Sequence, residues 1–385
     1  MILIYLSFVE KSFYHDYALF SMLYEFCLHW ICIYVNMKIM LIKIKSRIEK
    51  EIPAYLNRLN KACRLSRASP LLFNTIREFV SRSGKRIRPM LFIISYLGFT
   101  KKCAPGLYSS ALSIEFLHDY MLVHDDIIDK SDTRRGKPAM HKVLDDYLKK
   151  YKGIKFNGQD LAIVAGDVIY AISLHSFLSI KENPLRKETA LKKFIQATIY
   201  TGSGEFIELV YGTKNIKDIS KEEIFRVYDY KTACYTFATP LAVGAILAGA
   251  GKSESDRLFS YGIYLGRAFQ IKDDILGMFG HESKIGKSMF TDLKEAKKTI
   301  LIWYAYNNSG SIIKKEIQKI LTKPDAGKND LLRMRDIMTR SGALESAKNE
   351  VLQLIEISKQ ELARSKMSIK YKSSLDSYSR RILNL

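Results

Sequence analysis

The chain has 385 residues, of which 47% are hydrophobic and 26% are charged. This composition excludes a disordered protein, and the length allows one large core or two ordinary ones. Lys and Arg outnumber Asp and Glu by 61 to 40, a net charge of +21. The lysines are scattered in pairs and no nucleic-acid-binding motif is present, so we expect no nucleic-acid partner. The five cysteines lack CxxC spacing, which indicates a reduced cytoplasmic protein without a disulfide framework or zinc site.

Residues 1–36 differ in character from the rest of the chain. Residues 18–35 are apolar and aromatic over a length that just suffices to span a bilayer, and a basic flank follows. Glu25 near the middle opposes a span, and no basic segment precedes the run as in a signal peptide. Three interpretations remain open: translation that begins at Met37 or Met40, an extra helix that packs on the body or associates with a membrane, and a true membrane span.

From residue 37 onward the sequence predicts helices almost throughout. Apolar residues recur at spacings of three and four, and no sustained alternation indicates strands. The first of these helices is expected over residues 44–59, with Pro53 as a kink or break. No repeat, linker or shift in composition marks a second domain. We therefore predict an N-terminal extension over residues 1–36 and one all-α domain over residues 37–385.

The segment Ser83–Pro89, with the sequence SGKRIRP, precedes an apolar helix. Its glycine permits a tight turn, and its proline suits the first turn of the helix. The helix dipole disfavours cations at a helix start, so the three basic residues are better explained by an anion that they share. A solvated basic loop is the alternative interpretation.

A long, mostly buried helix is predicted within residues 107–135, because no Gly or Pro interrupts them and apolar residues recur at helical spacing. The first and last aspartates of its DDIID segment stand one turn apart on the same face. Carboxylate oxygens suit magnesium, which keeps several waters and shares substrate phosphates. Paired guanidinium groups follow at once, which predicts a site for a metal-bound diphosphate rather than a solvated helix end. The residues of this predicted site are Asp125, Asp126, Asp129, Arg134 and Arg135.

Two intermediate features precede the second acidic segment. Lys149–Gly158 is polar and is expected to form a surface loop, and Asp167 is expected to begin a helix rather than bind metal. Further on, Ser253 and Asp256 have the spacing of a capping box and predict a helix start. Small residues at Gly262 and Gly266 permit close packing of that helix, which leads into FQIKDDILG.

These segments together resemble the trans-polyprenyl diphosphate synthases, most closely the archaeal-type geranylgeranyl diphosphate synthases. DDIID followed by RRGKP, with His118 seven residues before Asp125, is similar to the family's first acidic motif, and FQIKDDILG to its second. The resemblance covers residues 40–310 or so and implies the isoprenoid synthase fold, a single large helical bundle around a central apolar cavity. Gly277 stands where many relatives have Asp, which leaves open how the third metal is held.

The resemblance also implies a reaction. Members of the family condense isopentenyl diphosphate with dimethylallyl, geranyl or farnesyl diphosphate. They use about three Mg²⁺ ions per active site and form homodimers in the cytoplasm. For this chain, membrane association through residues 1–36 stays open beside the cytoplasmic location.

Individual roles follow from the matched motifs. The expected metal ligands are Asp125, Asp129 and Asp273, with Asp126, Asp274 and Gln270 in supporting roles. The residues expected at isopentenyl diphosphate are Lys85, Arg88, His118 and Arg135. Those expected at the allylic diphosphate are Arg134, Lys231, Thr232 and Lys287, with Asp292 and Lys297 helping to close the site. Glu208 is expected to support the cavity wall or a nearby cation.

Tyr120 and Met121 stand five and four residues before Asp125. In the family, an aromatic residue at the first position alone resembles archaeal-type synthases that make the twenty-carbon product, because the ring blocks the growing tail. We therefore predict geranylgeranyl diphosphate as product, with a farnesyl or longer-chain synthase as the alternative. A terpene cyclase would not need the basic diphosphate cluster, and a non-catalytic partner subunit would be expected to lose the acidic motifs.

Overall fold

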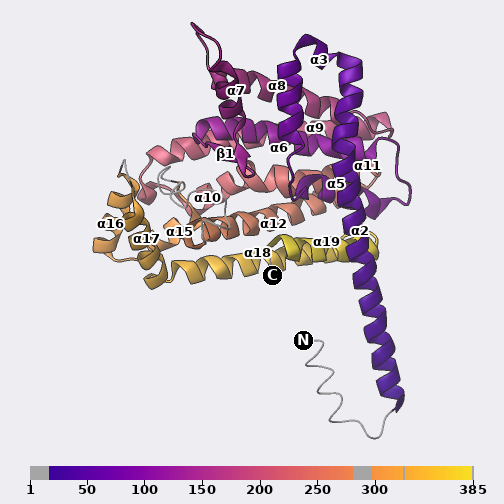
Figure 1. The fold of residues 1–385 in the computed structure, drawn as a ribbon. Helices are drawn as coiled ribbons and strands as arrows, with labels where there is room; N and C mark the ends of the chain where they lie inside the picture. The colour runs from indigo at the N-terminus through magenta and orange to yellow at the C-terminus, as the bar shows by residue number, and fades with distance from the viewer. Residues whose placement is uncertain (1–16, 281–296, 324–325, 384–385) are drawn as a thin grey trace. The chain divides into compact units, whose positions relative to one another are not determined.

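The computed structural model describes residues 17–280, 297–323 and 326–383, and nearly all of them are helical (Figure 1), which confirms the predicted all-α class. The first helices are α2 (Tyr17–Cys63), α3 (Leu65–Ala68), α4 (Pro70–Val80), α5 (Ile87–Phe99), α6 (Leu107–Ile128), α7 (Met140–Leu148), α8 (Gly158–Phe177) and α9 (Pro184–Thr213). They are followed by the 3₁₀ helix η1 (Ile216–Asp218), α10 (Lys221–Tyr228), the π-helix η2 (Asp229–Ala238), α11 (Thr239–Leu247) and α12 (Lys252–Phe279). The last are α15 (Ile300–Asn307), α16 (Ser311–Leu321), α17 (Lys328–Arg340), α18 (Ala343–Arg364) and α19 (Ile369–Leu383).

The chain divides into two compact units at Ser46 and Arg47, and all the residues of the candidate site lie in the unit Arg47–Leu385. The division falls within α2, as does the boundary predicted after residue 36. The helix predicted over residues 44–59 is part of α2, which continues through Pro53. The proline therefore does not end the helix, although it removes one backbone hydrogen bond.

Helix α6 lies in the core of the larger unit. It packs along α8 and α5, while α12 packs along η2 and α18. Two hydrogen bonds join α6 to α8: Ser110 of α6 donates to the carbonyl of Phe177 at 2.7 Å, and Ser176 of α8 donates to the carbonyl of Ser109 at 2.5 Å. The hydroxyl of Ser113 on α6 is also buried but has no hydrogen-bond partner, so hydrogen bonds offset only part of the desolvation of this helix.

Three glycines let α9 and α12 approach η2 closely from two sides. A Cβ atom added at Gly262 would lie 2.4 Å from the Cα atom of Ala238, and one added at Gly266 would lie 2.4 Å from that of Ala233. A Cβ atom at Gly204 on α9 would lie 2.6 Å from the backbone nitrogen of Lys231 in η2. The close packing predicted at Gly262 and Gly266 is thus confirmed, and η2 is held between two long helices.

The helix start predicted at Ser253 is correct to within one residue although its cap is wrong, and the helix start predicted at Asp167 is wrong. Helix α12 begins at Lys252 with Gly251 as its N-cap, so Ser253 caps nothing, and the Asp256 side chain is instead bonded by Lys252. Asp167 lies in the middle of α8, whose N-terminus is capped by Asn157 in a capping box. The polar loop was predicted correctly, since residues 149–157 connect α7 to α8 and are exposed.

Candidate active site

Arg134 and Arg135 lie in a short β-hairpin that follows α6, with strands of two residues each. Strands β1 (Thr133–Arg134) and β2 (Lys137–Pro138) are antiparallel. The turn residues Arg135 and Gly136 have φ values of 54° and 72°, and two successive positive φ angles characterise the tight turns that join such strands. The hairpin places Arg134 against α6, where its Nε donates to Oδ1 of Asp126 at 2.8 Å. Arg134 is thus paired with a protein carboxylate.

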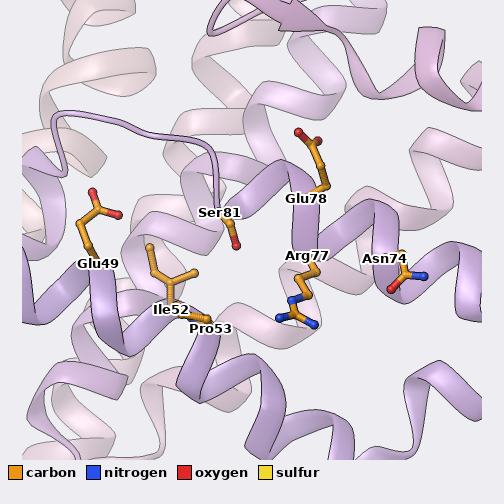
Figure 2. A pocket seen from close by; sticks show the side chains of 7 residues that line it. All are labelled: Glu49, Ile52, Pro53, Asn74, Arg77, Glu78 and Ser81. Atoms are coloured by element: carbon orange, nitrogen blue, oxygen red, sulfur yellow. The ribbon is translucent and has the colours of Figure 1, made fainter.

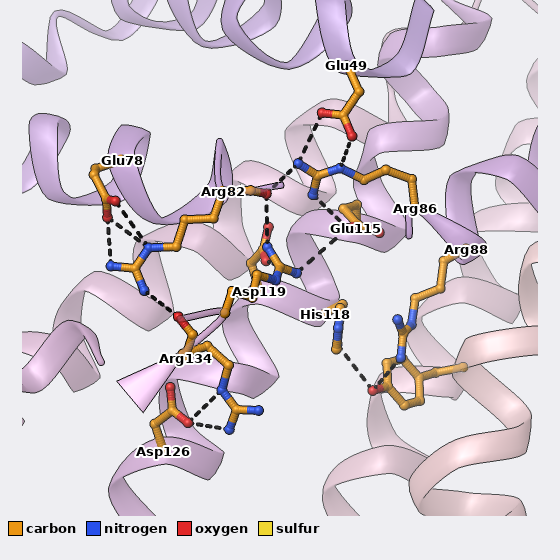
Figure 3. A network of polar contacts seen from close by, with 12 residues as sticks. Glu49, Glu78, Arg82, Arg86, Arg88, Glu115, His118, Asp119, Asp126 and Arg134 are labelled. Atoms are coloured by element: carbon orange, nitrogen blue, oxygen red, sulfur yellow. Dashed lines mark hydrogen bonds and ion pairs between the residues drawn. The ribbon is translucent and has the colours of Figure 1, made fainter. Parts of the chain in front are cut away.

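Two of the four side chains predicted to bind isopentenyl diphosphate, Arg88 and His118, meet at Tyr235 of η2 (Figure 3). Arg88 from α5 donates hydrogen bonds to the hydroxyls of Tyr235 and Thr236, each at 2.8 Å. The Tyr235 hydroxyl is also 3.3 Å from Nδ1 of His118 on α6. Burial, together with Arg88 and Arg135, lowers the pKa of His118 well below its usual value, so the imidazole is neutral. Lys85, three residues before Arg88 in the sequence, is exposed.

Arg135 lies against buried carboxylates of α6. Its Nη2 atom is 3.2 Å from Oδ1 of Asp119 and 3.9 Å from Oε1 of Glu115. Burial raises the pKa of Asp119 to about 7, although Arg135 acts in the opposite direction. Asp119 was not predicted as a site residue, because nothing in its local sequence separates it from the other polar residues of α6.

The first acidic motif ends α6, with Asp129 as its C-cap. Burial raises the pKa of Asp125 to about 7; Lys231 lowers it, whereas Glu205 and Asp129 raise it further. The Lys231 ammonium group forms an ion pair with Glu205 at 2.6 Å and hydrogen-bonds Glu208. Burial alone would lower the pKa of Lys231, but Glu208, Glu205 and Asp125 raise it above its usual value. The lysine therefore stays charged among three carboxylates.

The second acidic motif is tied to η2 by a chain of hydrogen bonds. Thr232 donates to Oε1 of Gln270 at 2.6 Å, and Nε2 of Gln270 donates to Oδ1 of Asp274 at 2.9 Å. Asp274 also accepts a hydrogen bond from the hydroxyl of Tyr228, which accepts one from the backbone of Ile300. These hydrogen bonds fix the position of the Asp274 side chain.

Of the three aspartates predicted to bind metal, Asp125 and Asp129 lie at the end of α6 and Asp273 lies on α12. Asp273 is exposed, in contrast to the buried Asp274. Within the described ranges, no three His, Cys, Asp or Glu side chains lie close enough together to hold a metal ion by themselves. Magnesium is commonly held by one or two carboxylates together with waters and substrate phosphates. Asp125, Asp129 and Asp273 carry the carboxylate oxygens that magnesium prefers, and their role as its ligands stays a prediction.

The remaining predicted residues are placed in part. The ring of Tyr120 lies 5.2 Å from that of Tyr170 on α8, so it faces the contact between α6 and α8, and Met121 is half-buried. Lys287 and Asp292 lie outside the described residues. Arg86, which was not assigned a role of its own, is buried and bonded to acids from two other helices.

A family model described as polyprenyl synthetase matches residues 69–338. The chain belongs to the polyprenyl synthetase family. A geranylgeranyl diphosphate synthase of Sulfolobus acidocaldarius is 32% identical, over 70% of this chain and 78% of its own length. A short chain isoprenyl diphosphate synthase of Methanocaldococcus jannaschii is 30% identical, over 72% and 76% of the two chains. A geranylfarnesyl diphosphate synthase of Aeropyrum pernix is 30% identical, over 80% and 90%.

Solved structures support the same fold. The geranylgeranyl pyrophosphate synthase of Corynebacterium glutamicum, determined with isoprenyl diphosphate and magnesium, matches with a TM-score of 0.80 at 24% identity. The match covers 89% of this chain and 98% of that one. The predicted family, the isoprenoid synthase fold and the enzyme class, a trans-prenyltransferase, are thereby confirmed.

Proposed function

We propose that this prenyltransferase condenses isopentenyl diphosphate with an allylic diphosphate, with the twenty-carbon geranylgeranyl diphosphate as its main product. The observation that supports this most strongly is the position of η2. One π-helix carries Tyr235 at the Arg88–His118 cluster, Lys231 beside the first acidic motif, and Thr232 bonded to the second. The predicted subsites of two diphosphates are therefore joined through ten consecutive residues.

In this mechanism the chain supplies binding and orientation. Lys231 and Thr232 would hold the diphosphate of the allylic substrate, while Lys85, Arg88 and His118 would hold that of isopentenyl diphosphate. Magnesium, held by Asp125, Asp129 and Asp273 when bound, would supply positive charge to the leaving diphosphate. A neutral His118 can donate one hydrogen bond and accept another, which suits an oxygen-rich group.

The proposed condensation needs no nucleophile from the protein. The carbon–oxygen bond of the allylic diphosphate breaks, and the double bond of isopentenyl diphosphate supplies the electron pair for the new carbon–carbon bond. The extended cation loses one proton to the departing diphosphate, which leaves the product and inorganic diphosphate. The role of the site is to stabilise the charges that develop as the first bond breaks.

We also propose that the enzyme acts as a homodimer in the cytoplasm. Several large apolar side chains on α8 and α9 are exposed, and a subunit contact would remove them from water. They include Ile163, Val164, Ile195, Ile199, Phe206 and Leu209. Among the described residues that were searched, α8 alone is long and apolar enough to cross a membrane, and it packs instead between α6 and α7. Light scattering during gel filtration should give twice the chain mass; a monomer would contradict the dimer.

The proposed reaction is tested by incubating the protein with magnesium, labelled isopentenyl diphosphate and each allylic primer in turn. The products are dephosphorylated and sized by chromatography. We expect a dominant twenty-carbon alcohol that disappears with EDTA. A fifteen-carbon or longer alcohol would keep the activity and contradict the product assignment, while the absence of product with every primer would contradict the function.

A further inference from the structure

Arg86 differs from the other cations of the SGKRIRP segment because it points into the protein. It is the N-cap of α5 and has a φ of 53°, in the left-handed region that non-glycine residues seldom adopt. Its side chain has no exposed surface, with a relative accessibility of 0%. A buried guanidinium group is stable only when its charge and donors are matched. Arg86 therefore has a role different from that of the exposed Lys85.

Three acceptors from three parts of the fold surround the Arg86 guanidinium (Figure 3). Its Nε donates to Glu49 on α2 at 3.0 Å, and its Nη1 donates to Glu115 on α6 at 2.8 Å. Its Nη2 donates to the carbonyl of Arg82 at 2.7 Å. Burial would lower the pKa of Arg86, but Glu115 and Glu49 raise it, so it stays charged. Because the donor fork is planar and rigid, these bonds fix the direction of the segment between α4 and α5.

The same acceptors also bind Arg135. Oε1 of Glu115 lies 3.9 Å from its Nη2, and the carbonyl of Arg82 accepts a hydrogen bond from its Nη1 at 3.4 Å. In turn, Nη1 of Arg82 donates to the carbonyl of Arg134 at 3.2 Å. The loop that bears Lys85 and the hairpin that bears Arg134 and Arg135 are thus joined by one buried network.

We infer that Arg86 is a positioning residue for the diphosphate of isopentenyl diphosphate, which it does not itself touch. It holds Arg88 at the Tyr235–His118 cluster and, through Glu115 and the Arg82 carbonyl, holds Arg135 in place. This inference rests on the proposed function. It also requires that loss of the Arg86 guanidinium weakens one substrate subsite selectively, whereas a merely structural role would affect both.

The positive φ angle of Arg86 makes glycine the substitution that disturbs the backbone least. Glycine adopts a positive φ without strain, so Arg86→Gly removes the guanidinium group without a backbone penalty. Arg64 provides a matched control: it also has a φ of 53° as the N-cap of α3, but its side chain is exposed. Arg64→Gly makes the same chemical change outside the network.

The network is also open to a small ion. A cavity of about 470 Å³ between α2 and α4 is lined by Glu49, the Arg86 partner, and by Glu78, the Arg82 partner (Figure 2). Its other lining residues are Ile52, Pro53, Asn74, Arg77 and Ser81. Free guanidinium ion can therefore reach the acid that Arg86 binds, which permits chemical rescue of the glycine variant.

The test measures the dissociation constant of isopentenyl diphosphate by calorimetry and the KM of the allylic primer by steady-state kinetics. For Arg86→Gly we expect the dissociation constant to rise at least tenfold and the KM of the primer to stay within about twofold. Millimolar guanidinium chloride should restore binding to Arg86→Gly and leave the wild type and Arg64→Gly unchanged. If Arg86→Gly does not fold, Arg86→Lys, which keeps the charge and loses the fork, should show the same selective loss.

Unchanged binding of isopentenyl diphosphate by Arg86→Gly would overturn the inference alone. Equal weakening of both substrates without guanidinium rescue would also overturn it, since that pattern indicates a structural role. A wild-type protein that does not bind isopentenyl diphosphate would overturn the proposed function and this inference with it.

Discussion

The substitution Gly204→Ala tests whether the close approach of α9 to η2 positions Lys231. A Cβ atom at Gly204 would lie 2.6 Å from the backbone nitrogen of Lys231 and 2.8 Å from the Cβ atom of Tyr230. Ordinary van der Waals contact begins at 3.4 Å, so the alanine should push the two helices apart by about 0.8 Å. Backbone atoms cannot rotate away as the end of a long side chain can.

The displacement should affect catalysis more than stability. Overpacking costs about 1–3 kcal/mol of unfolding free energy, while alanine gains about 1 kcal/mol of helix propensity over glycine. The net loss of unfolding free energy is therefore about 0–2 kcal/mol. In contrast, misplacing a substrate-positioning group by about 1 Å can lower the rate about a hundredfold. We expect kcat of Gly204→Ala to fall about ten- to a hundredfold, measured with varied allylic primer at saturating isopentenyl diphosphate.

Gly202 supplies the control on the same helix. It is exposed and has no atom within 4 Å of an added Cβ. Gly202→Ala should raise the unfolding free energy by about 1 kcal/mol in urea and leave kcat unchanged. If Gly204→Ala and Gly202→Ala have the same kcat, the separation of α9 from η2 does not position Lys231.

Other contacts lead to three further outcomes. Tyr120→Ala should lengthen the main product by at least one five-carbon unit, as sized by chromatography; an unchanged length would remove this ring from the control of chain length. Burial raises the pKa of Asp119 to about 7, above about 3.9 in the unfolded chain, so the native state binds more protons between these values. Asp119 should therefore contribute a fall in unfolding free energy as pH rises from about 4 to about 7, and this fall should be smaller in Asp119→Asn than in the wild type in urea titrations. Parallel curves of unfolding free energy against pH for the two proteins would contradict this effect of Asp119. Tyr228→Phe removes the hydroxyl that joins Asp274 to the backbone of Ile300 and should cost about 1–3 kcal/mol of unfolding free energy; a loss below about 0.5 kcal/mol would contradict a stabilising role.

Features that depend on neighbours along the chain could be predicted from the sequence. The spacing of Asp125 and Asp129 places both on one face of a helix, and the structure has that helix end at Asp129. Gly262 and Gly266 also stand one turn apart, so a close helix contact was predictable, although its partner was not. That partner is η2, and the sequence of Asp229–Ala238 contains no signal for a π-helix.

The role of Arg86 could not be predicted because its partners are distant in sequence. Glu49 and Glu115 are 37 and 29 residues away, and only the packing of α2 against α6 brings both to one guanidinium group. The three cations of the segment were expected to share one external anion. Arg86 instead binds carboxylates of the protein itself, which leaves Lys85 and Arg88 for the proposed substrate.

Two cap predictions made from local spacing missed the N-caps that the structure uses. Ser253 and Asp256 fit the capping-box pattern, but the N-cap of α12 is Gly251, two residues before Ser253, and the Asp256 carboxylate pairs with Lys252 one turn away. Asp167 was predicted to begin a helix, whereas the capping box that starts α8 is formed by Asn157 and Asp160, with Asn157 ten residues before Asp167. A capping prediction therefore needs the competing partners of each side chain as well as its spacing.

The most direct test is a structure determined with isopentenyl diphosphate, a non-ionisable thio analogue of the allylic diphosphate, and magnesium. We predict the isopentenyl diphosphate group against Lys85, Arg88 and His118, and the allylic diphosphate against Lys231 and Thr232. Metal density should lie between the allylic diphosphate and Asp125 on one side and Asp273 on the other. Diphosphates bound away from both Arg88 and Lys231, or metal ligated by neither Asp125 nor Asp273, would contradict the proposed active site.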